Sequence, residues 1–158
     1  MHHNIFISVL RNVTHLVALA FLLIGCNATK FVPEGQCLLN KAEVNVLDAP
    51  NAQLNDLATY LRQKPNTEIL GFWKLQMHIY NTAPKDTTKK SSRKMAENAH
   101  KMGEAPVIYD PLLTEISMKQ LERAMANKGY FNAEVDTIIS VKKRKVNLTY
   151  QITALYHP

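Results

Sequence analysis

The sequence predicts an α+β domain in which a three-stranded mixed sheet is covered on one face by two helices. Three observations support this prediction. Residues 42–46 alternate between apolar and polar side chains, residues 118–128 have an apolar face, and two alternating segments, 134–141 and 146–152, flank a basic turn. A period of two residues is typical of half-buried strands, and apolar residues three or four apart indicate a helix.

The composition is that of a folded chain with room for one domain. The 158 residues are 46% hydrophobic and 20% charged. Without residues 1–25, 18 Lys and Arg stand against 13 Asp and Glu, a net charge of +5. A basic balance is compatible with nucleic acid, anionic lipid or acidic partners, and it does not choose among them.

The first element is a short apolar segment that ends at a cysteine. Residues 13–24 are mostly apolar, and Arg11 is the only charged residue before Cys26. This length suits the core of a signal peptide and is short for a membrane span. Leu-Ile-Gly-Cys resembles the lipobox of bacterial lipoproteins, which implies a signal peptide at 1–25 and lipidation of Cys26. The alternatives are a signal anchor and a buried N-terminal helix.

The residues after Cys26 bear on its location and pairing. An Asp directly after the lipobox cysteine would resemble an inner-membrane retention signal. Here the residue is Asn27, which favours the outer membrane. No acidic run follows Cys26 that would resemble a surface-export tag. Cys37 could form a disulfide with Cys26, but lipidation of Cys26 would exclude this pairing. Residues 26–37 are expected to form a tether.

A strand and a helix are expected next. The strand begins at about Leu38 and is ended by Asp48-Ala49-Pro50. Asn51 is a plausible N-cap of the helix, and Pro65 would end it at about Lys64. The helix face is formed by Leu54, Leu57, Ala58 and Leu61.

An insertion is expected at about 66–107, and its first part is aromatic. Residues 69–81 contain Phe72, Trp73 and Tyr80. The spacing fits a short helix, which we expect, although alternating polar residues also suit a strand. The aromatic side chains either pack in a core or contact the membrane interface or a partner protein.

The second part of the insertion is polar and basic. Residues 81–102 have six Lys and Arg against two Asp and Glu, and part of 91–102 is a candidate helix. A solvated loop is the simpler interpretation, and contact with anionic lipid is the alternative. Residues 103–111 are expected to be extended.

Local signals mark the helix predicted at 118–128. Ser117 and Gln120 have the spacing of a capping box, and Ile116 with Leu121 that of a hydrophobic staple. Gly129 stands where the chain needs a left-handed residue after the helix.

Two strands follow as a hairpin. Residues 134–141 and 146–152 alternate on either side of four basic residues at 142–145. We expect the last strand in the centre of the sheet and 134–141 at its edge. The basic turn could suggest nucleic-acid binding, but a hairpin tip explains it more simply and protects sheet edges.

The element order resembles a POTRA domain. In that family a helix ends in Gly-Tyr or Gly-Phe, and Ala with an apolar residue then opens the hairpin. The matching residues are Gly129, Tyr130, Phe131, Ala133 and Val135. The resemblance implies a POTRA-like domain at 38–156, with both aromatic residues packed under the helix.

Residues 26–158 also resemble the N-terminal region of BamA/TamA-family outer-membrane proteins of Bacteroidetes. The segments that resemble them are "CNATKFVPEGQ", "YLRQKPNTEILGFWKLQ" and "GEAPVIYD". That family continues into further POTRA repeats and a β-barrel, whereas this sequence stops at Pro158. We therefore expect a truncated gene, a fragment or a stand-alone module, without barrel-dependent activity.

The resemblance implies a periplasm-facing module at the outer membrane that binds unfolded outer-membrane proteins or assembly subunits. The expected mode is β-augmentation, in which an extended client adds a strand to a sheet edge. One alternative is a structural envelope lipoprotein. Another is that the edge at 134–141 is only exposed to solvent or packs on a neighbouring domain. The expected partner-binding residues are Glu134, Val135, Asp136, Thr137, Ile138, Ile139, Ser140 and Val141.

Enzymatic activity is not expected. His78, His100 and His157 are scattered, and the sequence has no H-E-x-x-H motif and no glycine-rich phosphate loop. We therefore expect no metal site, no cofactor and no nucleic-acid partner.

Overall fold

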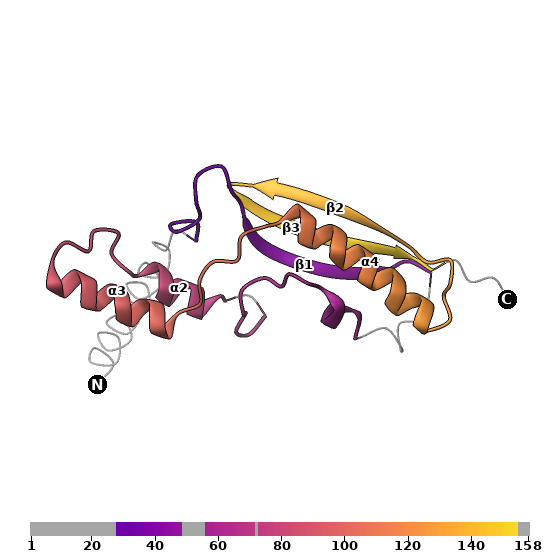
Figure 1. Cartoon of the computed structure of the whole chain (residues 1–158), viewed down its shortest axis with the longest axis horizontal. Helices are drawn as coiled ribbons and strands as arrows, with labels where there is room; N and C mark the ends of the chain where they lie inside the picture. Colours follow the sequence, from indigo (N-terminus) through magenta and orange to yellow (C-terminus); the bar gives the residue numbers. More distant parts are fainter. Residues whose placement is uncertain (1–27, 49–55, 72, 155–158) are drawn as a thin grey trace, which may run out of the picture.

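The computed structural model describes residues 28–48, 56–71 and 73–154 (Figure 1). Within them the elements follow the order strand, 3-10 helix, three α-helices and two strands. The predicted α+β class is confirmed. Cys26 and Phe72 lie outside the described residues.

The three strands form one mixed sheet. Strands β1 (Leu38–Val46), β2 (Glu134–Lys142) and β3 (Lys145–Thr153) have the order β1-β3-β2. The central strand β3 is parallel to β1 and antiparallel to β2. This confirms the predicted position of the last strand, and it leaves β2 at an edge of the sheet.

A tight turn joins β2 to β3. Lys143 and Arg144 have φ angles of +50° and +61°. Positive φ at both central residues matches the twist of the flanking strands, although Asn and Gly adopt it more easily. The turn is shorter than predicted, because Lys142 and Lys145 still pair with each other in the ladder.

Helix α4 (Pro111–Asn127) lies along one face of the sheet and begins before the predicted start at residue 118 (Figure 1). Asp110 is its N-cap, since the carboxylate accepts the Leu112 N–H over 2.8 Å. Pro111 occupies the first helical position, where its missing N–H costs nothing.

The predicted capping box at Ser117 and Gln120 is therefore wrong, and so is the staple. Ser117 lies inside α4 and is fully buried. Its hydroxyl donates to the Leu113 carbonyl over 2.7 Å and accepts the Arg62 N–H over 2.9 Å. Ser117 therefore does not cap the helix. It links the middle of α4 to the segment after η2.

The end of α4 agrees with the sequence in part. Gly129 has a φ of +95°, as predicted for the residue after the helix. Tyr130 packs against the core, but Phe131 is 81% exposed, so the expectation that both aromatic residues lie under the helix is wrong for Phe131.

Only a short helical turn is present in the described part of the helix predicted to end near Lys64. It is the 3-10 helix η2 (Leu57–Tyr60), and Leu61 already has extended backbone. Leu57 and Leu61 are buried, as their spacing predicts. The prediction for residues 51–55 lies outside the described part of the chain.

Hydrogen bonds to a distant segment explain why the chain leaves the helix early. The Gln63 amide donates to the Ile108 carbonyl and accepts the Asp110 N–H over 3.1 Å. The Asn66 amide donates to the Ala105 carbonyl over 2.7 Å and accepts the Val107 N–H over 3.0 Å. Residues 61–66 are thus held extended beside residues 105–110.

Two helices lie beyond the end of the sheet (Figure 1). They are α2 (Leu75–Asn81) and α3 (Lys90–Met102), which confirm the short helix expected in 69–81 and the candidate helix in 91–102. Ala83, Ala96 and Ala99 form a small core between them.

The segment expected to be a tether is packed against these elements. Ala28 and Val32 are buried with Leu38 and Met77. The Lys30 ammonium donates to two backbone carbonyls at the end of α2, over 2.9 Å and 2.6 Å. Residues 28–32 are therefore bound to the folded domain.

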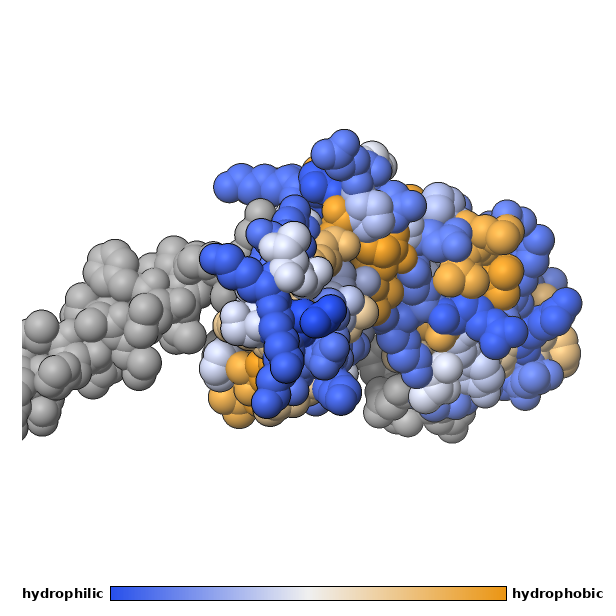
Figure 2. Space-filling model, turned by 60° about the vertical axis from the view of Figure 1, so that its left-hand side comes forward, coloured by the Kyte–Doolittle hydropathy of each residue, from blue (hydrophilic) through white to orange (hydrophobic). Residues whose placement is uncertain are grey.

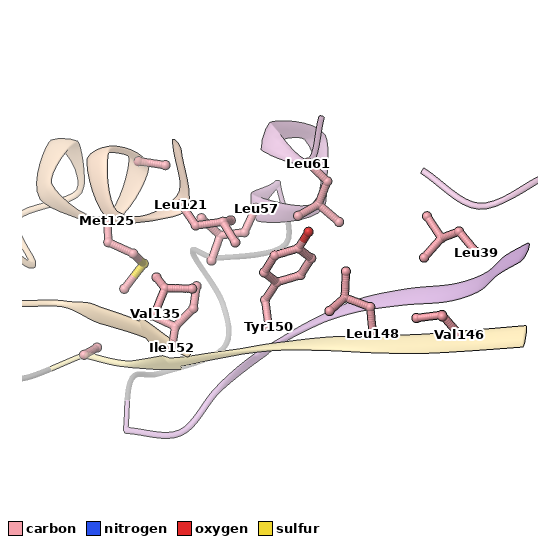
Figure 3. Close-up of a cluster of buried hydrophobic side chains, with 12 residues drawn as sticks. Leu39, Leu57, Leu61, Leu121, Met125, Val135, Val146, Leu148, Tyr150 and Ile152 are labelled. Carbon is pink, nitrogen blue, oxygen red and sulfur yellow. The ribbon is translucent and has the colours of Figure 1, made fainter. Parts of the chain in front are cut away.

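The main core lies between the sheet and the side formed by α4 and η2 (Figure 3). Strand β3 contributes Val146, Leu148, Tyr150 and Ile152, all fully buried or nearly so. Leu121 and Met125 of α4 cover them from above. Burial of such side chains contributes roughly 1.5–3 kcal/mol each, so this layer fixes the sheet and its free edge.

Candidate functional site

The candidate site is the free edge of β2. β3 binds one side of this strand, and in the described chain no strand pairs with the other. Its apolar side chains are exposed to an unusual degree: Ile138 by 51%, Ile139 by 46% and Val141 by 59%. An edge strand with such side chains can pair with another chain unless something covers it.

The register shows on which face each apolar side chain lies. Val135, Ile139 and Val141 pair with buried residues of β3, so they share the face that α4 covers. Val135 is buried in the core, whereas Ile139 and Val141 are exposed. Helix α4 therefore covers the first part of β2 and leaves the part nearest the turn open.

The other face of β2 is more polar. Ile138 lies there with Asp136 and Ser140, because successive side chains of a strand alternate. Glu134 and Asp136 are exposed there, whereas Thr137 lies on the core face, half-buried opposite Tyr150. All eight predicted edge residues thus lie on one open strand.

Two of the aromatic residues predicted as a second contact surface, Trp73 and Tyr80, are not brought together in this way. Trp73 is half-buried at the base of a loop, where it exchanges backbone hydrogen bonds of 2.8 Å and 3.1 Å with Ile69. Tyr80 instead stacks on His100 with ring centroids 4.3 Å apart, and Phe31 meets Tyr80 edge-on at 5.5 Å. Tyr80 therefore helps to join α2 and α3 to the N-terminal segment.

A basic pocket lies between the loop, α2 and the start of the sheet. It has a volume of about 280 Å³ and its lining includes Ala28, Gly71, Lys74, His78 and Lys145. Lys74 donates to the Asn40 carbonyl and lies 3.4 Å from the Glu68 carboxylate. Burial lowers the pKa of the Lys74 ammonium, and the charge of Glu68 opposes this shift.

His78 lines the same pocket. Burial lowers the pKa of its imidazole, and the charge of Lys145 lowers it further. Its Nδ1 atom is buried without a hydrogen-bond partner in the described chain. The sequence alone did not single out this pocket, because its lining comes from four separate segments.

Some kinds of site are absent from the described residues. No group of three or more His, Cys, Asp or Glu side chains there could hold a metal ion. Within the same ranges, no helix is long and apolar enough to cross a membrane. Cys37 is a free, half-buried thiol. The predicted lipidation concerns Cys26, which lies outside the described residues.

Comparison with protein families decides the assignment. The family model of the POTRA domain, described as surface antigen variable number repeat, matches residues 74–154. The chain belongs to the POTRA family. No curated protein and no solved structure is significantly similar to it.

The POTRA match covers α2 to β3 and leaves out β1, which the structure nevertheless places in the same sheet. POTRA domains are generally scaffold and interaction modules that face the periplasm in outer-membrane protein assembly. The edge of β2 therefore belongs to a domain whose general work is binding protein chains.

Proposed function

We propose that this chain is a lipid-anchored, periplasm-facing POTRA module that binds outer-membrane protein clients or partner subunits at the β2 edge. The binding mode is β-augmentation: an extended segment of the client pairs with the backbone of β2. Backbone hydrogen bonds give affinity without demanding one sequence, which suits a module that handles many clients.

The observation that carries the proposal is the exposure of the turn-proximal half of β2. Ile139 and Val141 lie on the core face of the sheet, yet each exposes about half of its side chain. A client strand beside them would place every second side chain on this same face. It would thereby extend the core by one strand and bury both residues.

The proposed anchor at Cys26 would keep the module at the outer membrane. Several acyl chains on one cysteine give stable attachment, whereas a single chain gives only marginal binding. This part of the proposal is supported by the lipobox-like sequence and agrees with the periplasmic setting of POTRA domains.

Site-specific photo-crosslinking tests the proposal. A photoreactive amino acid at Thr137 should capture client polypeptides in cells, and the same probe at Trp73 measures the competing aromatic surface. If probes along 134–141 capture nothing while those at 72–80 do, β-augmentation at this edge is wrong.

A matched pair of variants separates the edge from general surface charge. Ile138→Lys places a cation on the open edge, where it should oppose strand addition and reduce crosslinking from Thr137. Asn45→Lys adds the same charge at an exposed position of β1, the other outer strand, and should leave crosslinking unchanged.

A further inference from the structure

The loop from Ile69 to Trp73 presents an apolar tip to solvent. Leu70 is 81% exposed and has a φ of +57°, and Gly71 follows with a φ of +76°. The left-handed region is sterically unfavourable for a leucine. A side chain that is both strained and exposed contributes little to folding, so its place at the tip needs another explanation.

One lysine of the β2–β3 turn lies near the base of this tip, and two more line an adjoining pocket. Gly71 and Lys145 line the same pocket, and an adjoining pocket of about 260 Å³ shares Lys145 and adds Lys142 and Lys143. The carboxylates nearby are engaged: Glu68 faces Lys74, and Glu43 pairs with Lys41 at 2.5 Å. In the described chain no carboxylate lies within ion-pair distance of Lys142, Lys143 or Lys145.

Helix α4 and strand β2 do not share this charge. Residues 110–141 contain five acidic and three basic residues, whereas all four residues at 142–145 are basic. Hydrophilic side chains cover most of the α3 end of the molecule, with separate apolar patches between them (Figure 2). Helix α3 is also basic, with four Lys and Arg residues against one Glu, so an anionic partner would meet the turn or α3 rather than α4.

The described start of the N-terminal segment lies at the same place. Ala28 lines the pocket together with Gly71 and Lys145. The Arg144 guanidinium donates to the Val32 carbonyl over 2.9 Å and so ties this segment to the turn. In the sequence, Cys26 stands two residues before Ala28.

We propose that this end of the module lies on an anionic phospholipid bilayer, with Leu70 among the headgroups and the three lysines facing lipid phosphates. The contact residues are named the membrane patch: Leu70, Lys142, Lys143 and Lys145. The inference extends the proposed function, because the lipid on Cys26 would supply the attachment and the patch would set the orientation. Basic side chains beside an apolar tip are typical of proteins that rest on anionic membranes.

The orientation has a consequence for client binding. The Lys142 end of β2 would lie nearer the bilayer than the Glu134 end. A strand of nine residues is about 30 Å long. A client paired with β2 would thus be held along a line that leads to the membrane surface.

Trp73 is the chain's single tryptophan and serves as an intrinsic probe of the patch. The processed full-length protein is reconstituted into vesicles of brominated phosphatidylcholine, with or without brominated phosphatidylglycerol. Bromine quenches tryptophan fluorescence at short range, so quenching of Trp73 is expected when the anionic lipid is present. Quenching should be weaker in vesicles of phosphatidylcholine alone.

Two variants test the patch itself. Leu70→Asn should keep the fold, because Asn tolerates positive φ, and it should reduce the quenching. Lys142→Glu with Lys143→Glu should abolish the dependence on anionic lipid. Lys119→Glu with Arg123→Glu makes the same change in net charge at exposed positions of α4 and should have no effect.

Absence of quenching, or quenching that neither patch variant changes, overturns the proposal. Mass spectrometry of the processed protein separates this result from failure of the anchor. If Cys26 carries no lipid, the anchor proposal is wrong, and the protein added to the same vesicles from solution still tests the patch through Trp73.

Discussion

The backbone N–H of Arg62 donates to the Oγ of Ser117 over 2.9 Å, which links the segment after η2 to the middle of α4. Ser117→Ala would leave this N–H without an acceptor beside a fully buried position. The free energy of unfolding should fall by about 1–3 kcal/mol, the cost of an unsatisfied buried polar group. Urea unfolding followed by Trp73 fluorescence measures the change. Ser140→Ala, at an exposed position, is the control, and an equal effect in both variants would contradict the prediction.

Tyr150 presents the opposite case. It is fully buried, and its hydroxyl has no hydrogen-bond partner among the described residues. Tyr150→Phe removes a polar group that gains nothing from burial, so stability should stay the same or rise by about 1 kcal/mol. Thermal and urea unfolding measure this. A clear loss of stability would mean that the hydroxyl has a partner, such as a bound water molecule.

Gly103 is required by a close approach of two helices. A Cβ atom at this position would lie 2.4 Å from the Tyr80 nitrogen and 2.7 Å from the Ala99 carbonyl oxygen. Because both are backbone atoms, Gly103→Ala should force α2 and α3 apart and cost about 1–3 kcal/mol. Gly35→Ala is the control: it has open space around it and a φ of +77°, so it should cost about 1 kcal/mol from the backbone alone. Equal losses would contradict the packing argument.

Acidification should destabilise the chain in part through His78. Burial and the charge of Lys145 lower the pKa of His78 below its ordinary value of 6.5. Between the folded pKa and 6.5 the unfolded chain binds more protons, so stability falls as the pH drops through this window. His78→Gln should therefore lose less stability than wild type between about pH 7 and pH 5. Urea unfolding at both pH values checks this, and equal losses would contradict it.

If Cys26 is lipidated, replacing it should block processing of the precursor. Cys26→Ala should leave an uncut precursor that carries no lipid, whereas globomycin, which blocks cleavage alone, should leave an uncut precursor of the wild-type protein. Gel mobility and membrane fractionation measure both properties. Cys37→Ala is the matched control and should be processed normally. Mature Cys26→Ala protein of normal size in the membrane fraction would show that the lipobox interpretation is wrong.

Periodicity predicted much of the sheet because it reports which side of a strand faces the core. The alternation at 134–141 and 146–152 and the basic turn between them were enough for the hairpin and for β2 as an edge. Leu57 and Leu61 were likewise recognised as buried. Their burial did not make residues 61–64 helical, since Gln63 and Asn66 bind the backbone of 105–110 instead.

The start of α4 shows where two local signals competed. The spacing of Ser117 and Gln120 fits a capping box, but Asp110-Pro111 is also a helix-start signal, and the helix begins there. The signal was present in the sequence, as an Asp followed by Pro at the first helical position. For the candidate site, β2 was found from the sequence except for Lys142, whereas Leu70 was not, because its exposure depends on how the loop folds.

Residue order alone therefore determined the strands, the hairpin and the stop of α4 at Gly129, since each depends on alternation or on one left-handed residue. Tertiary contacts decided which part of β2 stays open, where α4 begins and how residues 28–32 bind α2. The physical reason is that these features depend on hydrogen bonds and packing between segments far apart in the chain. The pattern within one segment does not reveal such distant partners, which come into contact only when the sheet has folded.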